Sequence, residues 1–293
     1  MHDGVLLAET VLRLSAERER ADEWGLVLAS AGIASRTEMQ GSRCAVIIGS
    51  EDAARAEATL AAYERENPAR PAVAAAPREY GPTYAGVVIG LLLLAFYAVT
   101  GPRDAGGVWF RRGSATAELI VRGEVWRTVT ALTLHADLAH VAGNALFGAL
   151  FATALCRAVG PGVGVWLMLL TGAAGNALNA LLHGSRHSAV GASTAILGAV
   201  GSLGTLQFVR RSRLQVTRWR TWAPIAAALG LLAMVGMGSD TDFLAHGFGF
   251  LVGSVLGLAA GRALRHPPGG LAQATLGLAA LGAVVACWYV ALR

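Results

Sequence analysis

The stretch GASTAILGA, residues 191–199, places a serine, Ser193, at the head of a long apolar run. Small residues surround this serine, and small residues in a membrane helix allow another backbone to approach closely. A hydroxyl in such a place can pack, cap a helix or act as a nucleophile. Its role depends on the polar side chains that other apolar segments bring near it.

The composition is that of an integral membrane protein. Of the 293 residues, 54% are hydrophobic and 15% are charged, which is too apolar for an ordinary soluble domain. Apolar runs of about 17–25 residues can cross the hydrocarbon core as helices. Seven runs are predicted to do so: 83–99, 138–156, 162–182, 191–209, 222–238, 242–264 and 271–292. We therefore expect an all-α polytopic membrane protein.

Arginines in the short connections indicate how the spans are oriented, since basic residues are retained on the cytoplasmic side. The densest group lies between the fourth and fifth spans, and others follow the second and the sixth, although the longer loop 100–137 also carries several. The N-terminus is therefore expected in the cytoplasm and the C-terminus outside, in the plasma (inner) membrane. Arginines facing anionic lipid account for the net charge of +5, so no nucleic-acid partner is expected.

The N-terminal part is more charged than the rest of the chain. Residues 1–67 are expected to form a small cytoplasmic α+β domain, in which a hairpin lies between two helices and Ser50 caps the second helix. The segment 68–82, rich in proline and alanine, is predicted to be a linker. Because the domain contains no candidate catalytic group, we interpret it as a regulatory or interaction module for a partner or ligand that the sequence does not name.

Candidate partners for Ser193 lie in two other predicted spans. The run HADLAHVAGN carries His135, His140 and Asn144, and the last two are four positions apart, on one helical face. The sixth span carries His246. At ~1.5 Å per residue, these groups enter their spans at similar depth near the outer surface. Ionisable groups in hydrocarbon are costly, so their coincidence indicates a functional site.

Glycines predict how Ser193 and His246 meet. Gly249, Gly253 and Gly257 recur every four residues after His246 and form two consecutive GxxxG motifs. The span that begins near Ser193 carries small residues of its own. Close packing of these two spans would bring the serine hydroxyl within hydrogen-bond reach of the imidazole.

Other functions remain open at this point. The polar groups could only bond one another between helices. A metal-dependent hydrolase or metal carrier would use His135, His140 and His246, but there is no HExxH motif, and the cysteines form no metal-binding pattern. A transporter would place its polar site near the membrane midplane. No metal or other cofactor is therefore expected.

The sequence resembles the rhomboid family of intramembrane serine proteases over about residues 83–265. The matching motifs are GluValTrpArg at 124–127, His135 with His140 and Asn144, GlyAlaSer at 191–193, and AlaHis at 245–246 followed by Gly249 and Gly253. The resemblance implies a six-helix core with a Ser–His dyad. A seventh span is similar to the six-plus-one arrangement of some members. The motif at 124–127 is interpreted as a structural clasp within its loop.

The resemblance implies a role for each matching residue. Ser193 would be the nucleophile and His246 the general base, while His140, Asn144 and the backbone N–H of Ser193 would form the oxyanion hole. The substrates would be single-pass transmembrane segments, cleaved near the outer surface and entering past the fifth span. A catalytically inactive rhomboid-like protein that binds transmembrane helices is the alternative.

The chain departs from the family pattern at two positions. Thr194 replaces a common glycine, and Leu197 replaces an aromatic residue that stacks on the catalytic histidine. No acid is expected to orient His246, and Asp240 and Asp242 are expected to be polar residues at the entrance of its span. The loop residues His183 and His187 are expected to be incidental. The expected division is a cytoplasmic domain at 1–67, a linker at 68–82, a six-helix core at 83–265 and an additional C-terminal helix at 266–293.

Overall fold

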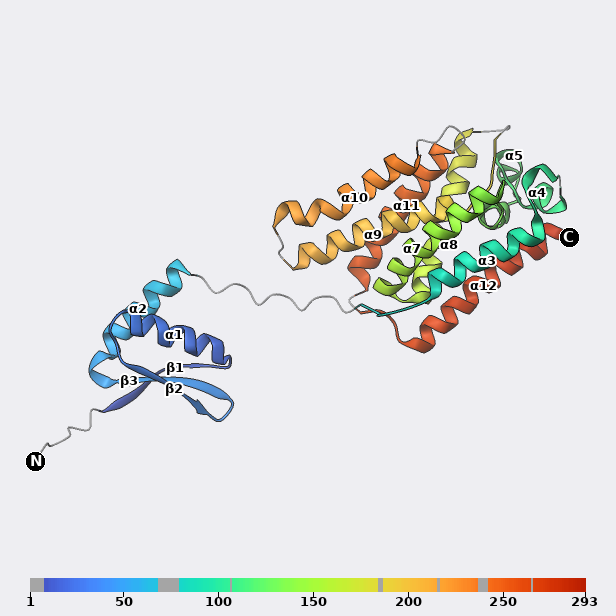
Figure 1. Cartoon of the computed structure of the whole chain (residues 1–293). Helices are drawn as coiled ribbons and strands as arrows, with labels where there is room; N and C mark the ends of the chain where they lie inside the picture. The colour runs from blue at the N-terminus through green and yellow to red at the C-terminus, as the bar shows by residue number, and fades with distance from the viewer. Residues whose placement is uncertain are drawn as a thin grey trace, which may run out of the picture. The chain divides into compact units, whose positions relative to one another are not determined.

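A computed structural model describes residues 8–67, 79–105, 107–183, 187–214, 217–236, 242–264 and 266–293. The chain divides into two compact units, Met1–Ala72 and Val73–Arg293 (Figure 1). Each unit has its own hydrophobic core. Most of the segment interpreted as a linker, residues 68–78, lies outside the described residues.

The first unit is a three-stranded antiparallel sheet with two helices. Its elements are β1 (Glu9–Ser15), α1 (Arg18–Ser30), β2 (Ser35–Gln40), β3 (Arg43–Gly49), a 3-10 turn (Ser50–Asp52) and α2 (Ala53–Glu66). The strand order is β1-β3-β2. Alternate residues of the central strand, Cys44, Val46 and Ile48, pack with Leu28 of α1 and Leu60 of α2, which fixes the helices on one face of the sheet.

Two features of this unit differ from the sequence-based expectation. Strand β1 was not predicted, and it pairs along β3 from Glu9 to Ser15. Ser50 does not cap α2, because its hydroxyl donates to the carbonyl of Ala8 at 2.6 Å and α2 begins after the 3-10 turn. The missing strand explains the second error, since the residue before β1 provides the acceptor for Ser50.

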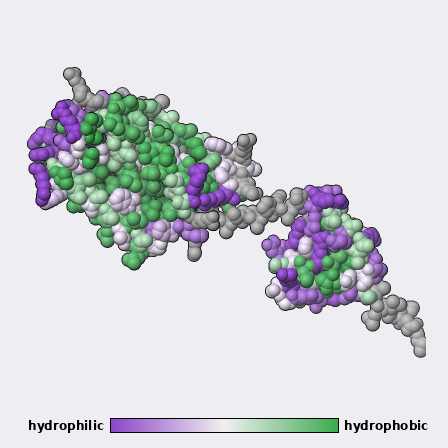
Figure 2. All heavy atoms as spheres, turned by 180° about the vertical axis from the view of Figure 1, so that it is seen from behind, coloured by the Kyte–Doolittle hydropathy of each residue, from purple (hydrophilic) through white to green (hydrophobic). Residues whose placement is uncertain are grey.

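The second unit contains a long helix at each of the seven predicted spans. These are α3 (Ala85–Thr100), α7 (Leu138–Val159), α8 (Pro161–His183), α9 (Ser193–Arg213), α10 (Arg218–Gly236), α11 (Phe243–Ala263) and α12 (Gly270–Leu292). By length and composition, five of them can cross a membrane, namely α3, α7, α8, α11 and α12. Figure 2 shows a broad hydrophobic surface on this unit with hydrophilic residues toward its ends. The protein is therefore a multi-pass membrane protein.

Helix α9 lies at the centre of this unit, which explains why it is less apolar than its neighbours. It packs against α7, α8, α10 and α11, and every residue from Thr194 to Ser202 is buried. A helix enclosed by other helices can carry serine, threonine and glycine because their hydroxyls find partners there. The Ser202 hydroxyl, for example, donates to the Gly253 carbonyl of α11 at 2.9 Å.

Glycines set the distance between α9 and α11, as the sequence predicted. A Cβ atom at Gly249 would collide with the carbonyl oxygen of Thr194, and one at Gly253 would collide with that of Gly198. The two backbones are thus in direct contact over successive turns. This part of the packing prediction is confirmed.

The connection between α3 and α7 is built from short elements rather than from an extended loop. They are a 3-10 turn (Arg103–Ala105), α4 (Val108–Gly113), β4 (Ala115–Thr116), α5 (Ala117–Val121), α6 (Arg127–Thr130) and a further 3-10 turn, η3 (Ala131–Thr133). The buried Arg127 pairs with Glu124 at 2.7 Å and donates to the carbonyls of Ser114 and Arg111, both at 3.0 Å. The prediction of a structural clasp at 124–127 is confirmed.

The backbone contact of α9 with α11 can be tested by adding one methyl group. Gly253→Ala places its Cβ against the Gly198 carbonyl, whereas a Cβ at Gly247, on the same helix, has no neighbour within 4 Å. Gly253→Ala is expected to lower the free energy of unfolding by roughly 1–3 kcal/mol, the usual cost of overpacking. Gly247→Ala is expected not to lower it, because alanine is a better helix former than glycine. Thermal denaturation of both variants in one detergent measures this difference. Equal melting temperatures would show that the contact is loose.

Candidate active site

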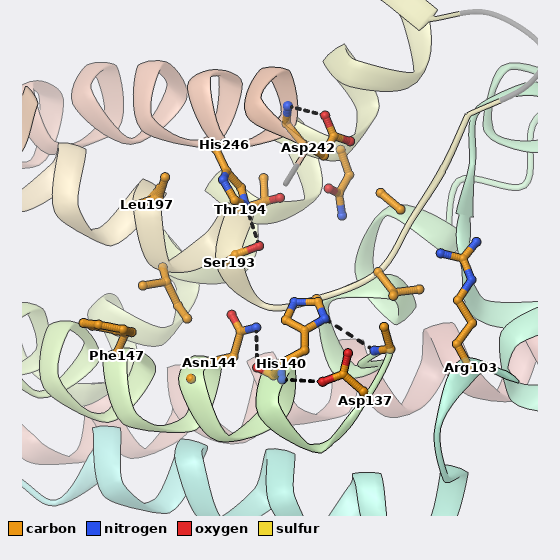
Figure 3. Close-up of a pocket in the computed structure, with 18 of the residues that line it drawn as sticks. Arg103, Asp137, His140, Asn144, Phe147, Ser193, Thr194, Leu197, Asp242 and His246 are labelled. Atoms are coloured by element: carbon orange, nitrogen blue, oxygen red, sulfur yellow. Dashed lines mark hydrogen bonds between the residues drawn. The ribbon is translucent and has the colours of Figure 1, made fainter. Parts of the chain in front are cut away.

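Ser193 and His246 meet where α9 and α11 touch. Ser193 is the first residue of α9, and His246 lies in the first turn of α11. The Nε2 atom of His246 is 2.7 Å from the Oγ atom of Ser193 (Figure 3). Ser193 and His246 lie just before Thr194 and Gly249, where the backbones of α9 and α11 are in contact. Because the imidazole is also buried, the packing of the two helices holds the hydrogen bond in place.

The turn before Ser193 requires glycine. Gly191 has a φ of 127°, a value that residues with a side chain rarely adopt, and a Cβ there would lie 2.7 Å from Nε2 of His140. The turn therefore brings the backbone before the serine directly against the His140 ring. The Gly191 N–H donates to the carbonyl of Ala131 at 2.9 Å, which holds the turn against the segment that precedes α7.

The hydrogen bonds of His140 determine which ring nitrogen carries its proton. The backbone N–H of Ala136 donates to Nδ1 at 3.4 Å, so neutral His140 carries its proton on Nε2. Nε2 is the atom that lies over Gly191, two residues before Ser193. His140 thus presents an N–H donor beside the serine. Asp137 fixes the start of α7 by accepting from the His140 N–H at 2.8 Å.

Asn144 and His135 take different places around His140. The amide nitrogen of Asn144 donates one hydrogen to the His140 carbonyl at 2.9 Å, which leaves its second hydrogen for another acceptor. His135 is fully buried before α7, and its ring meets that of His140 edge to face with centroids 5.2 Å apart. Burial, reinforced by the nearby His140, lowers the pKa of His135 to about 4. His135 therefore supports His140 as a neutral ring and does not line the cavity described next.

A cavity of about 800 Å³ opens above these residues. Ser193, His246, His140 and Asn144 all line it, together with Phe147 on the next turn of α7. The cavity brings together the four side chains to which the resemblance assigns catalytic roles, whereas His135 does not line it. It is large enough for an extended peptide segment of a few residues and contains both polar and apolar walls.

A carboxylate at the rim was only partly anticipated. Asp242 caps α11 by accepting from the Ala245 N–H at 3.1 Å, and its other oxygen contacts the Asn179 amide and the His187 ring. His183 stacks on His187 with centroids 4.4 Å apart. His187, which was expected to be incidental, thus contacts the residue that caps α11 and lines the cavity. The contact joins residues far apart in the sequence, and only the capping role of Asp242 could be read from its position before a helix.

The two departures from the family pattern are accommodated differently. The Thr194 methyl group fills the space left by Gly175 of α8 and Gly249 of α11, so threonine fits where those glycines lack a side chain. Leu197 is buried one turn after Ser193 and packs with Val200 and Ala228. Leu197 has no aromatic ring that could stack on His246. The Nδ1 atom of His246 has no hydrogen-bond partner in the described part of the chain.

Comparisons with known proteins point to the same family. Residues 122–263 match the family described as Rhomboid domain. This range includes the clasp at 124–127 and α7 through α11, but not α3, α12 or the first unit. The rhomboid protease GluP of Bacillus subtilis (strain 168) is 32% identical over 124 residues, which are 42% of this chain and 24% of that protein. The chain thus spans about a quarter of the length of this relative.

The matched range contains Ser193 and the three side chains near it in the cavity that the sequence analysis had identified, His140, Asn144 and His246. With this match and the shared motifs, residues 122–263 resemble a rhomboid domain within a multi-pass helical fold.

Proposed function

We propose that the protein is an intramembrane serine endopeptidase that uses a Ser193–His246 dyad. The observation that carries this proposal is the 2.7 Å contact between Ser193 Oγ and His246 Nε2 at the floor of the cavity. A hydroxyl becomes a competent nucleophile when a base within hydrogen-bond reach takes its proton. The alternative, an inactive rhomboid-like protein that only binds transmembrane helices, is disfavoured because both dyad positions are occupied.

The reaction follows from this contact. Ser193 Oγ attacks the carbonyl carbon of the scissile peptide while its proton passes to His246 Nε2. The tetrahedral intermediate collapses, the C–N bond breaks, and His246 returns the proton to the leaving amine. Water then attacks the acyl-serine ester with His246 again as base, which releases the acid product and restores Ser193.

Three donors surround the position of the developing oxyanion. The Ser193 N–H has no partner within α9, because the first N–H groups of a helix lack one. His140 offers Nε2–H and Asn144 its second amide hydrogen. Donors that are already oriented toward a developing negative charge stabilise the transition state strongly in a site poor in water.

The site operates as a dyad rather than a triad. Among the described residues nothing bonds to Nδ1 of His246, and the Asp242 carboxylate is occupied by Ala245, Asn179 and His187. Asp242 therefore positions the beginning of α11 without orienting the imidazole directly.

Replacing Asp242 distinguishes the dyad from a triad. Asn retains the ability to cap a helix, so Asp242→Asn should keep kcat within about tenfold of the wild type. Removal of the orienting acid from a serine-protease triad instead lowers kcat by about 10⁴. Cleavage of a single-pass model substrate by purified protein in detergent gives the comparison. A loss as large as that of His246→Ala would make Asp242 a member of the catalytic group.

Single substitutions should separate the dyad from the oxyanion donors. Ser193→Ala and His246→Ala should each abolish turnover, and the double variant should be no worse, because the two residues act as a unit. Asn144→Ala and His140→Ala should leave Ser193-dependent cleavage slowed by about 10²–10³, as loss of one oxyanion donor does. Initial rates of the purified variants measure these losses. Activity that survives in His246→Ala but not in His140→Ala would make His140 the base.

We further propose that cleavage occurs near the outer membrane surface and that the substrates are single-pass transmembrane segments. These would enter laterally past α10. The arginines after α7, α9 and α11 support a cytoplasmic N-terminus, an external C-terminus and residence in the plasma membrane. The first unit, in which the sequence of residues 1–67 contains no candidate catalytic group, is proposed to bind a regulatory partner or ligand.

Reporter fusions test this orientation. A cytoplasmic reporter joined after residue 70 should be active, whereas the same reporter at the C-terminus should be silent, and a reporter that requires export should show the reverse. The expectation rests on the retention of basic connections inside the cell. If both positions report the same side, the proposed orientation is wrong.

A further inference from the structure

Helix α12 lies outside the range matched to the rhomboid domain, yet both of its ends contact other elements of the second unit. Near its beginning, the buried Gln273 donates to the Val159 carbonyl at 3.0 Å and accepts from the Val163 N–H at 3.0 Å. Gln273 thereby bridges α12 and the connection between α7 and α8. Trp166 of α8 adds an indole N–H donated to the Leu276 carbonyl of α12 at 2.8 Å.

The other end of α12 carries Trp288, which is buried in an aromatic cluster. Its ring lies 5.5 Å from that of Phe96 and 5.2 Å from that of Trp109, centroid to centroid. It also packs against Leu134, and a Cβ at Gly113 would collide with it. These contacts hold the Trp288 side chain in a single position.

The polar end of the Trp288 ring points to the segment that precedes α7. Its Nε1–H donates to the Thr133 hydroxyl at 3.1 Å. A buried indole N–H usually finds such a partner, but here the acceptor belongs to residues 131–136, which we call the support segment. The support segment contains neither Ser193 nor His246. It does contact Gly191, which precedes Ser193, and His140.

Two hydrogen bonds connect the support segment to the candidate site. At one end, the Ala131 carbonyl accepts from the Gly191 N–H at 2.9 Å, two residues before Ser193. At the other, the Ala136 N–H donates to His140 Nδ1 at 3.4 Å and directs Nε2–H toward the site. Thr133 lies between these two contacts. Its own hydroxyl proton goes to the Thr130 carbonyl at 2.8 Å, which leaves the oxygen to accept from Trp288.

We propose that Trp288 is a positioning residue for the oxyanion donors, acting through Thr133 and the support segment on His140 and Gly191. The proposal rests on the function proposed above and adds to it a role for α12. Oxyanion donors contribute strongly only when they are held in the geometry of the transition state. A helix outside the matched domain would then complete the catalytic geometry without contributing a group that touches the substrate.

Trp288→Phe tests this role, because it keeps an aromatic ring in the cluster and removes only the N–H and part of the ring. It should lower kcat by roughly three- to tenfold, the scale of one neutral hydrogen bond, and leave KM unchanged because Trp288 and Thr133 do not line the cavity. Trp166→Phe is the matched control. It removes the same donor from the contact of α8 with the beginning of α12 and should leave kcat unchanged.

Changes at Thr133 provide a second route if Trp288→Phe does not fold. Thr133→Val removes the acceptor and should lower kcat as Trp288→Phe does, whereas Thr133→Ser keeps the hydroxyl and should retain the wild-type rate. The double variant Trp288→Phe/Thr133→Val should be no slower than the slower single variant. In a His140→Ala background, Trp288→Phe should have at most a small further effect, which a general loss of stability would not produce. Melting temperatures identify such a loss.

Two failures can be told apart. If the wild type shows no Ser193-dependent cleavage, the proposed function is wrong and the role of Trp288 is refuted with it. If the wild type is active but Trp288→Phe and Trp166→Phe have the same kcat, the function stands and the positioning role is refuted. Equal rates of Thr133→Val and Thr133→Ser would refute it in the same way.

Discussion

Direct backbone contact between α9 and α11 is the constraint on which the candidate site depends. Serine and histidine have short side chains, so a 2.7 Å hydrogen bond between them requires that their helices touch. Gly249 and Gly253 permit this, since a Cβ at either would collide with a carbonyl of α9. In hydrocarbon, where no hydrophobic force joins helices, such close packing and interhelical hydrogen bonds hold them together. The same contact therefore stabilises the fold and brings Ser193 and His246, the proposed dyad, together.

The remaining polar groups are placed by the ends of helices and by turns. Gly191 brings the backbone against His140, Asp137 fixes the beginning of α7, and Asp242 fixes the beginning of α11. Helix beginnings supply free N–H groups, so a site built there already contains donors for an oxyanion. Leu197 provides no ring for His246 to stack on. The orientation of that imidazole consequently depends mainly on Ser193 and on the packing of α11.

The sequence could predict the parts of this arrangement that depend on local spacing. Four-residue intervals identified the glycines of α11 and the shared face of His140 and Asn144, and apolar length located the seven helices. It could not predict β1, whose identity as a strand depends on pairing with β3. The contacts of His187 with Asp242 and of Trp288 with Thr133 join distant segments. Such contacts leave no local pattern in the sequence, because they depend on how whole helices pack against one another.

Covalent labelling of the serine tests the central claim most directly. The intact protein in detergent is treated with a fluorophosphonate, and mass spectrometry of its peptides locates the modification. The account predicts a single adduct on Ser193 that disappears in His246→Ala, because the hydroxyl needs the base that α11 brings to it. Labelling of Ser193 at the wild-type rate in His246→Ala, or an adduct at another residue with Ser193 unmodified, would contradict it.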